Sequence, residues 1–159
     1  MKKLISLSLA IILLLSVCLM GGCGGSKDAD LKAVLTDINN SFGEATSGLT
    51  QLESVDDLNK YYMIDTSTVK QYAAEITSDK AKAPVEIVLV EANDAEGAKA
   101  IETVLNQRYQ QICNTYSSYS PEEYEMAKNC GVTTSGNYVT MIIAEDYDEI
   151  LAKVNESIA

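Results

Sequence analysis

The stretch Val85-Glu86-Ile87-Val88-Leu89-Val90-Glu91-Ala92 decides the fold, together with the residues that follow it. Successive apolar side chains from 87 to 90 predict a strand with both faces buried. Asn93, followed three residues later by Glu96, is typical of a helix start. Apolar residues then recur every three or four positions, which predicts a long helix with one apolar stripe: Ala98, Ile101, Leu105, Tyr109, Ile112 and Tyr116. We expect this helix to pack on a sheet that contains residues 85–92.

Two predicted strand pairs flank this helix in the sequence. Residues 72–77 alternate between apolar and polar side chains and are expected to pair with residues 85–92 as a hairpin. Residues 132–135 and 138–144 form the second predicted hairpin, because Gly136-Asn137 between them suits a type II′ turn. Residues 44–53 are polar and are expected to form a loop.

Helices are expected on both sides of each hairpin, at residues 31–42, 54–62, 120–129 and 146–158. Ser54 with Asp57 predicts a capping box, and Ser120-Pro121 is typical of a helix start with proline at its first position. Paired strands with helices between them predict the fold class α+β, with an antiparallel sheet of about four strands, in two hairpins, packed against helices.

Composition excludes several classes of function. The chain has 159 residues, 12 basic and 23 acidic side chains, a formal charge of −11 and no histidine. The negative charge argues against a nucleic-acid partner, because phosphates repel it. Without histidine the chain has no Ser-His or Cys-His nucleophile pair, no imidazole metal ligand and no imidazole general base. We therefore expect a protein that is not an enzyme and that holds no metal or other cofactor.

The first 23 residues form a separate segment. Met1-Lys2-Lys3 is basic, residues 4–20 are uncharged and rich in Leu and Ile, and Met20-Gly21-Gly22-Cys23 follows. This order describes a secretory signal peptide. Its end resembles a bacterial lipobox, with cleavage between Gly22 and Cys23 and acylation of Cys23. The alternatives are an ordinary cleaved signal, an uncleaved membrane anchor, and lipidation at Cys18, which follows a β-branched valine where the motif has a small residue.

This prediction divides the chain into a lipoprotein signal peptide (1–22), a lipidated N-terminus with a short flexible tether (23–29), and a single α+β domain of unknown function (30–159). Cys23 would carry diacylglycerol and acyl groups such as palmitate, since two or three chains give a stable membrane anchor. Loss of two lysines changes the net charge from −11 to −13. Anionic lipids repel such a domain, so the acyl groups would hold it at the outer, extracytoplasmic face of the cell membrane.

Several short motifs of the exported part resemble a family of small bacterial lipoproteins, of the Gram-positive type, that carry a domain of unknown function. The motifs are Asp30-Leu31-Lys32-Ala33-Val34-Leu35, Ala73-Ala74-Glu75-Ile76, Tyr119-Ser120-Pro121-Glu122-Glu123-Tyr124 and Gly136-Asn137-Tyr138-Val139. With the lipobox, the resemblance covers roughly residues 31–158. It implies a location and a fold, and it carries over no catalytic residue, because these motifs are mainly caps, turns and core positions.

Cys113 and Cys130 are the thiols that remain once Cys18 is removed and Cys23 is acylated. Exported cysteine pairs often form disulfides. In two antiparallel helices joined near residues 117–120, these two cysteines would be offset by about 9 Å, whereas a disulfide spans at most about 7 Å between Cα atoms. We therefore favour two buried or half-buried thiols, and a Cys113–Cys130 disulfide is the alternative.

Nine tyrosines, against one phenylalanine and no tryptophan, are an unusual enrichment. Tyr109, Tyr116, Tyr119 and Tyr124 gather around the junction of the two middle helices, where they form either a contact surface or a core edge with hydroxyls at the rim. We favour the core edge because Tyr109 and Tyr116 lie on the apolar stripe. Arg108, the only arginine, is expected to lay its stem over apolar surface with its charged head in water.

Acidic clusters occur where helices are predicted to begin: Asp56-Asp57, Glu122-Glu123-Glu125 and Glu145-Asp146-Asp148-Glu149. Carboxylates at these positions favour the helix dipole, and none of the clusters matches a calcium-binding loop. We therefore favour capping over metal ligation or acid–base catalysis. The sequence predicts a membrane-tethered, non-enzymatic lipoprotein that binds an unknown protein or envelope component. The alternative is a small-ligand-binding or chaperone-like accessory to a transporter or envelope machine.

Overall fold

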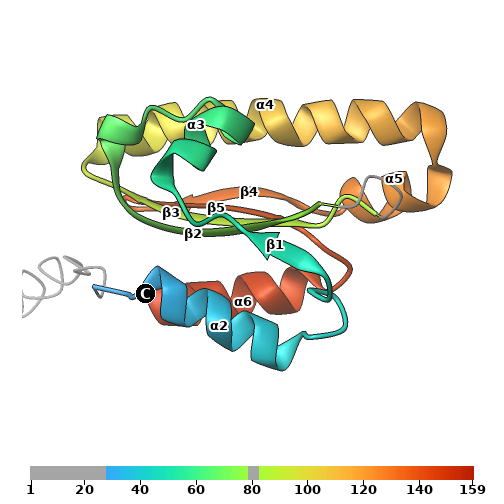
Figure 1. Ribbon diagram of the computed structural model, residues 1–159, viewed down its shortest axis with the longest axis horizontal. Helices are drawn as coiled ribbons and strands as arrows, with labels where there is room; N and C mark the ends of the chain where they lie inside the picture. Colours follow the sequence, from blue (N-terminus) through green and yellow to red (C-terminus); the bar gives the residue numbers. More distant parts are fainter. Residues whose placement is uncertain (1–27, 79–82) are drawn as a thin grey trace, which may run out of the picture.

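The computed structural model describes residues 28–78 and 83–159 (Figure 1). The predicted signal peptide (1–22), the predicted lipidation site Cys23 and the tether up to residue 27 lie outside the described residues. One antiparallel sheet with the strand order β1-β2-β3-β5-β4 forms the centre of the fold. Its strands are β1 (Leu49–Gln51), β2 (Val69–Thr77), β3 (Glu86–Ala92), β4 (Gly131–Ser135) and β5 (Tyr138–Ile143).

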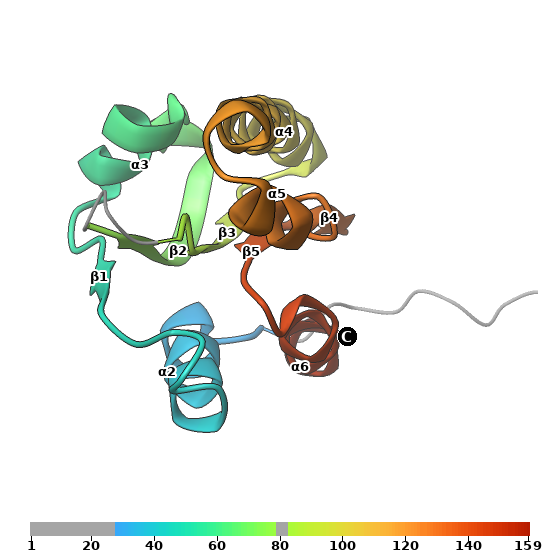
Figure 2. The ribbon, with the colours of Figure 1, turned by 90° about the vertical axis from the view of Figure 1, so that its right-hand side faces the viewer.

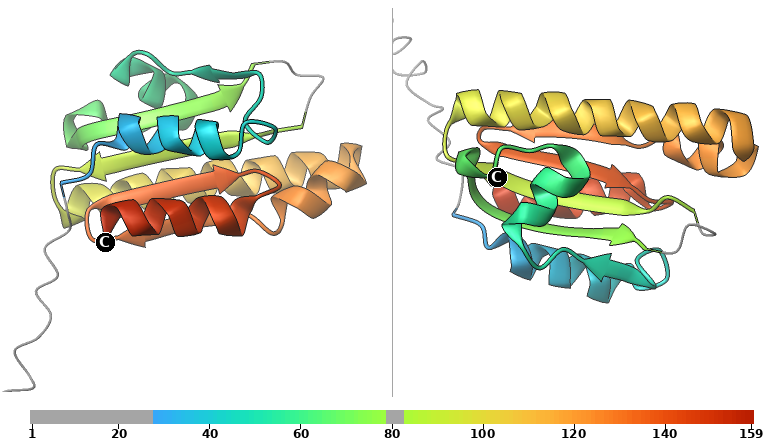
Figure 3. Two further views of the ribbon diagram at one scale, coloured as in Figure 1. Left: turned by 90° about the horizontal axis from the view of Figure 1, so that it is seen from below. Right: turned by 45° about the horizontal axis from the view of Figure 1, so that its top comes forward.

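Helices cover both faces of this sheet (Figure 2). On one face lie α3 (Val55–Tyr62) and α4 (Ala95–Tyr119), with α5 (Pro121–Ala127) beside the end of α4. On the other face α2 (Leu31–Ser41) and α6 (Tyr147–Ile158) lie side by side (Figure 3). A 3-10 turn (Thr66–Thr68) leads into β2. The predicted α+β class is confirmed, with five strands where about four were expected.

β3 runs through the middle of the core, which explains why it is apolar on both faces. Val88 and Val90 belong to the apolar cluster under α4, whereas Ile87 and Leu89 belong to the cluster under α2 and α6. All four side chains are at most 1% exposed. Burial of each such side chain contributes about 1.5–3 kcal/mol, so this strand joins two apolar layers into one core.

Both predicted hairpins are present. β2 pairs antiparallel with β3, with Ala74 opposite Val88, and β4 pairs antiparallel with β5, with Thr133 opposite Thr140. Gly136, between β4 and β5, has a φ of +58°, the left-handed value that a type II′ turn needs at its first central position. The two hairpins join because β3 also pairs with β5.

Three local features differ from the sequence predictions. The loop expected at residues 44–53 contains the edge strand β1, which forms because Leu49 pairs with Thr77 of β2. The turn expected at 117–120 shortens to Ser120, because α4 continues through Tyr119. The N-cap of α4 is Asp94, one residue after the expected Asn93. The first difference adds a strand, and the other two shift the ends of α4; the order of the predicted elements is unchanged.

The chain enters the fold at the beginning of β2. The Ala29 carbonyl accepts a hydrogen bond from Gln71 Nε2 at 2.7 Å, and Asp28 forms an ion pair with Lys70 at 2.9 Å. The other end of β2, at Thr77, lies about 23 Å away along the strand at 3.3 Å per residue. The entry point of the chain and the far end of the sheet are therefore well separated.

Candidate functional site

A groove of about 780 Å³ lies on the α4 face of the sheet, at the end of β2 far from the entry of the chain. Five elements contribute to its lining: β1, the end of β2, the start of β3, α3 and the second half of α4. The right view of Figure 3 shows the arrangement of these helices and strands. We name this cavity the α4 groove. Its lining residues are Thr50, Leu52, Tyr61, Ile76, Thr77, Ser78, Pro84, Glu86, Arg108, Gln111, Ile112, Thr115 and Tyr116.

The base of the α4 groove is an ion pair between Glu86 of β3 and Arg108 of α4. Glu86 is 4% exposed. The Arg108 guanidinium binds it in the bidentate way, with Nε donating to Oε2 at 3.2 Å and Nη2 donating to Oε1. Nη1 donates to Gln111 Oε1 at 3.3 Å. Burial lowers the pKa of Arg108, but the bond to Glu86 outweighs it and leaves the pKa above its usual value. The pair thus carries no net charge.

This contact shows that the expectation of a solvated Arg108 head is wrong. The side chain is 31% exposed, and its charged end is bound to Glu86. A sequence signal for this pair exists, because Arg108 falls between Leu105 and Ile112 on the buried stripe of α4. Glu86 likewise shares a strand face with Val88. A charged residue in an apolar stripe requires a buried partner, and this rule points from Arg108 to a carboxylate on the facing strand.

α3 supplies Tyr61 to the groove lining, and the next residue, Tyr62, is buried in the core. Tyr61 is 42% exposed at the rim, where the Lys60 ammonium lies 4.8 Å from its ring centroid. Tyr62 is 3% exposed, and its hydroxyl makes no hydrogen bond of standard geometry within the described residues. Burial first, and then the nearby Glu86 carboxylate, raises the pKa of Tyr62 above its usual value. The hydroxyl therefore stays protonated beside the ion pair.

Capping fixes α3 in this position. The Ser54 hydroxyl accepts a hydrogen bond from the Asp56 N–H, and the Asp57 carboxylate accepts one from the Ser54 N–H, which is the predicted capping box. The helix ends at Met63, which has a φ of 61° and is 79% exposed. A left-handed conformation costs a residue other than glycine about 1–2 kcal/mol. Strain of this kind is typical of turns that place functional side chains.

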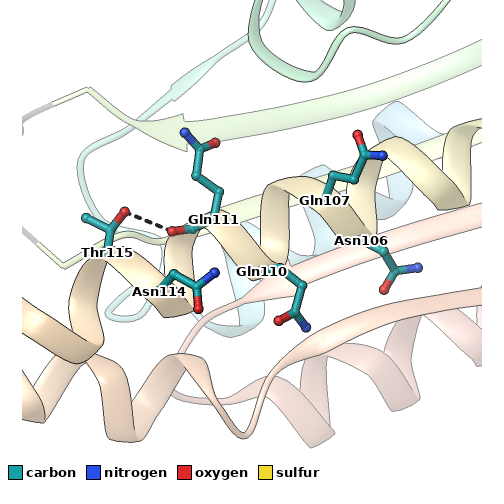
Figure 4. Close-up of a pocket in the computed structure, with 6 residues that line it drawn as sticks. All are labelled: Asn106, Gln107, Gln110, Gln111, Asn114 and Thr115. Atoms are coloured by element: carbon teal, nitrogen blue, oxygen red, sulfur yellow. Dashed lines mark hydrogen bonds between the residues drawn. The ribbon is translucent and has the colours of Figure 1, made fainter.

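A shallow depression of about 660 Å³ runs along the exposed side of α4 next to the groove (Figure 4). Its lining consists of amide side chains and one threonine: Asn106, Gln107, Gln110, Gln111, Asn114 and Thr115. We name this surface the amide face. It forms two rows, because residues four apart lie on the same side of a helix. Gln111 and Thr115 line both the amide face and the α4 groove, so the two are continuous.

A family model that describes a domain of unknown function, DUF4358, matches residues 43–144 of the chain. The chain belongs to the DUF4358 family. The matched span runs from just before β1 to the end of β5 and contains every residue that lines the α4 groove and the amide face. It excludes α2 and α6 and is narrower than the 31–158 span of the motif resemblance. No curated protein and no solved structure matches the chain.

The four tyrosines considered as a contact surface have different environments in this DUF4358 protein. Tyr109, Tyr116 and Tyr124 are partly buried against the core under α4, in the core-edge arrangement. Tyr119, at the end of α4, is 85% exposed. Of the four, Tyr116 lines the α4 groove. The set therefore divides into three partly buried rings and one exposed ring.

Cys113 and Cys130 are free thiols, each 9% exposed. The Cys130 Sγ lies 3.3 Å from the carbonyl oxygens of Met126 and Ala144. Burial raises the pKa of Cys130. Burial also raises the pKa of Tyr109, and both sulfurs add to that shift. In the DUF4358 domain the two cysteines thus form a small buried cluster that is not part of the groove lining.

Carboxylates occupy the first turns of α3, α5 and α6, as the helix-start pattern predicts: Asp56, Asp57, Glu122, Glu123, Asp148 and Glu149. The Ser120 and Asp146 side chains make no capping hydrogen bond at α5 and α6. Within residues 28–78 and 83–159, no three or more Cys, Asp or Glu side chains are grouped to hold a metal ion. In the same part of the DUF4358 protein, no helix has the length and apolar character to cross a membrane.

Proposed function

We propose that this DUF4358 protein is a lipid-anchored, extracytoplasmic binding module of a bacterial envelope, that it is not an enzyme, and that the α4 groove is its binding site. The groove itself carries the proposal. Among the described residues that line it, the charged ones are Glu86 and Arg108, and they neutralise each other. Cavities of about 300–1,000 Å³ that combine apolar and aromatic side chains with polar groups that fix the orientation of a ligand are typical binding sites.

The N-terminal sequence supports the anchor. Cys23 precedes Asp28 by five residues, which reach at most about 17 Å when extended. Contacts to Lys70 and Gln71 fix the start of the domain at the beginning of β2. An acyl group on Cys23 would therefore keep this end of the sheet near the membrane. The α4 groove, at the opposite end, would stay accessible to a partner in the envelope.

Two kinds of partner are supported by different features of the groove. Its base, where Glu86 is 4% exposed, favours a ligand that enters a cavity. This supports the second candidate function, a small-ligand-binding or chaperone-like accessory. Its rim, where Tyr61 is 42% exposed, favours contact with a larger partner. The binding role is common to both, and we expect the first contacts at Tyr61, near the end of α3.

Site-specific crosslinking tests the binding site. A photo-crosslinking amino acid replaces Tyr61 in the full-length protein, in cells, and adducts are identified by mass spectrometry. The matched control carries the same amino acid at Tyr119, which is more exposed but lies outside the groove. We expect adducts that are specific to position 61. The same adducts at both positions, or none at position 61, would contradict the assignment of the groove.

Acylation tests the anchor separately. A Cys23→Ser variant is expected to lose incorporation of labelled palmitate and to leave the membrane fraction. Cys18→Ser is the matched control, and it is expected to stay labelled and membrane-bound, because Cys18 belongs to the predicted signal peptide. A Cys23→Ser protein that is still labelled would show that the anchor assignment is wrong.

A further inference from the structure

We infer that the α4 groove and the adjoining amide face bind an uncharged glycan chain, a polymer of sugar rings with hydroxyl and acetamide groups. This inference rests on the proposed binding role of the groove. It names the chemical class of the ligand, which that role leaves open. Charge, hydrogen-bonding capacity and the position of the groove on the sheet each support it.

The charge of the surface favours an uncharged ligand. The chain has a net charge of −11, yet none of the residues that line the amide face is ionisable. In the groove, Arg108 binds Glu86 through two nitrogens and Gln111 through the third. An anion would have to compete with Glu86 for the guanidinium, and a cation would have to reach a carboxylate that is 4% exposed. A neutral ligand does not have to displace Glu86 from Arg108 and does not have to reach the buried carboxylate.

The hydrogen-bonding groups match those of a sugar polymer. Each amide side chain both donates and accepts, as sugar hydroxyl and acetamide groups do. Gln107, Gln110 and Asn114 make no side-chain hydrogen bond within the described residues, so these amides face solvent with their donors and acceptors available. From Asn106 to Asn114 the face extends about 12 Å along α4. Figure 4 shows Gln107 and Gln111 on one side of the helix and Asn106 and Gln110 on the other.

The position of the groove argues against an extended peptide. Peptides that add to a sheet pair with the free backbone groups of an edge strand. Most of the groove lies over the face of the sheet, where β2 is paired on both sides by β1 and β3, and β3 on both sides by β2 and β5. β1, the edge strand that also bounds the groove, has only three residues with which a peptide could pair. The groove therefore offers mainly side-chain groups. The rings of Tyr61 and Tyr116 provide flat apolar surfaces, against which the C–H face of a sugar ring can pack.

Calorimetric titration of the full-length protein in detergent tests the inference. The probe is the β-1,4-linked tetrasaccharide of N-acetylglucosamine, and the second probe is a glucose tetrasaccharide, which has hydroxyls but no acetamide. We expect the first to bind more tightly. Tyr61→Ala and Asn114→Ala are each expected to weaken its binding by about fivefold or more. The matched controls Tyr119→Ala and Asn155→Ala, exposed and outside the site, are expected to bind as wild type does.

Three results would overturn the inference. The first is no binding of either saccharide at 10 mM. The second is tighter binding of an uncharged Gly/Asn tetrapeptide, which would assign the site to peptides. The third is an equal loss in the control variants, which would place binding elsewhere. Protein adducts at Tyr61 in the crosslinking experiment, combined with no saccharide binding, would overturn the glycan class and leave the binding role intact. Equal binding of the two saccharides would overturn the acetamide assignment.

Discussion

Replacing Glu75 by Gln is expected to stabilise the domain at neutral pH. Glu75, on β2, is 5% exposed, and its Oε2 accepts a hydrogen bond from Asn39 Nδ2 at 3.0 Å. The remaining oxygens of the two side chains, Glu75 Oε1 and Asn39 Oδ1, are buried without a partner. Both are acceptors when the carboxyl is ionised, whereas a protonated carboxyl adds a donor to this buried pair. Burial raises the pKa of Glu75, although the bond from Asn39 partly opposes this.

In the Glu75→Gln variant an amide N–H takes the place of that proton. One gained buried hydrogen bond contributes about 0.5–1.5 kcal/mol, which raises the Tm of a domain of this size by roughly 2–6 °C. The folded pKa of Glu75 lies above the unfolded value, so wild-type stability falls as the pH rises from the unfolded pKa through the folded pKa. Gln does not titrate. The advantage of the variant is therefore small near pH 4 and grows toward pH 8.

Urea unfolding followed by far-UV circular dichroism between pH 4 and pH 8 measures this difference. Glu86→Gln is the matched control, because Glu86 is 4% exposed but paired with Arg108. The same chemical change is expected to destabilise there, by about 2–3 kcal/mol, since it removes the charge that Arg108 needs. A Glu75→Gln protein that is less stable than wild type at pH 8, or equally favoured at pH 4 and pH 8, would refute the reasoning.

Three further predictions test other parts of the fold. Arg108→Met is expected to lower the free energy of unfolding by about 2–3 kcal/mol in urea, because Glu86 stays buried without its partner; an unchanged midpoint would contradict this. Met63→Gly is expected to raise the free energy of unfolding by about 0.5–1 kcal/mol, since it relieves the left-handed conformation; a lower Tm would contradict this. Cys113 and Cys130 are expected to react with iodoacetamide about a hundredfold more slowly in the folded protein than in urea, by mass spectrometry, because both are buried; fast native labelling would contradict this.

The central strand and the long helix could be predicted from the sequence because their signals are local. Apolar side chains at 87–90 mark a strand buried on both faces, and the stripe from Ala98 to Ile112 marks the helix that covers it. β1 could not be predicted in this way, since three residues are too few to show an alternation. This strand exists because Leu49 and Gln51 pair with β2, which is a tertiary contact.

The groove could not be predicted from local sequence patterns, because its walls come from segments that are far apart in the sequence. Glu86 and Arg108 are 22 residues apart and meet only when α4 packs on β3. The helix around Arg108 could be predicted, and with it the exposed amides, but its neighbours across the sheet could not. The same applies to Tyr61. The capping box predicts the helix α3, but it does not show that the end of this helix lies at a cavity. The chemistry of each wall is visible in the sequence, and the juxtaposition of the walls is not.

The ion pair at the base of the groove is a feature that stability alone does not explain. Replacing a buried ion pair by well-packed apolar residues is often neutral or stabilising, so a domain selected for stability had no need of Glu86 and Arg108. An apolar base would extend the exposed apolar surface of Tyr61 and favour unspecific association. A single unpaired charge would select ions of the opposite sign. A neutralised pair gives the groove a polar base that has neither net charge nor additional apolar surface, and such a base is compatible with the uncharged ligand proposed above.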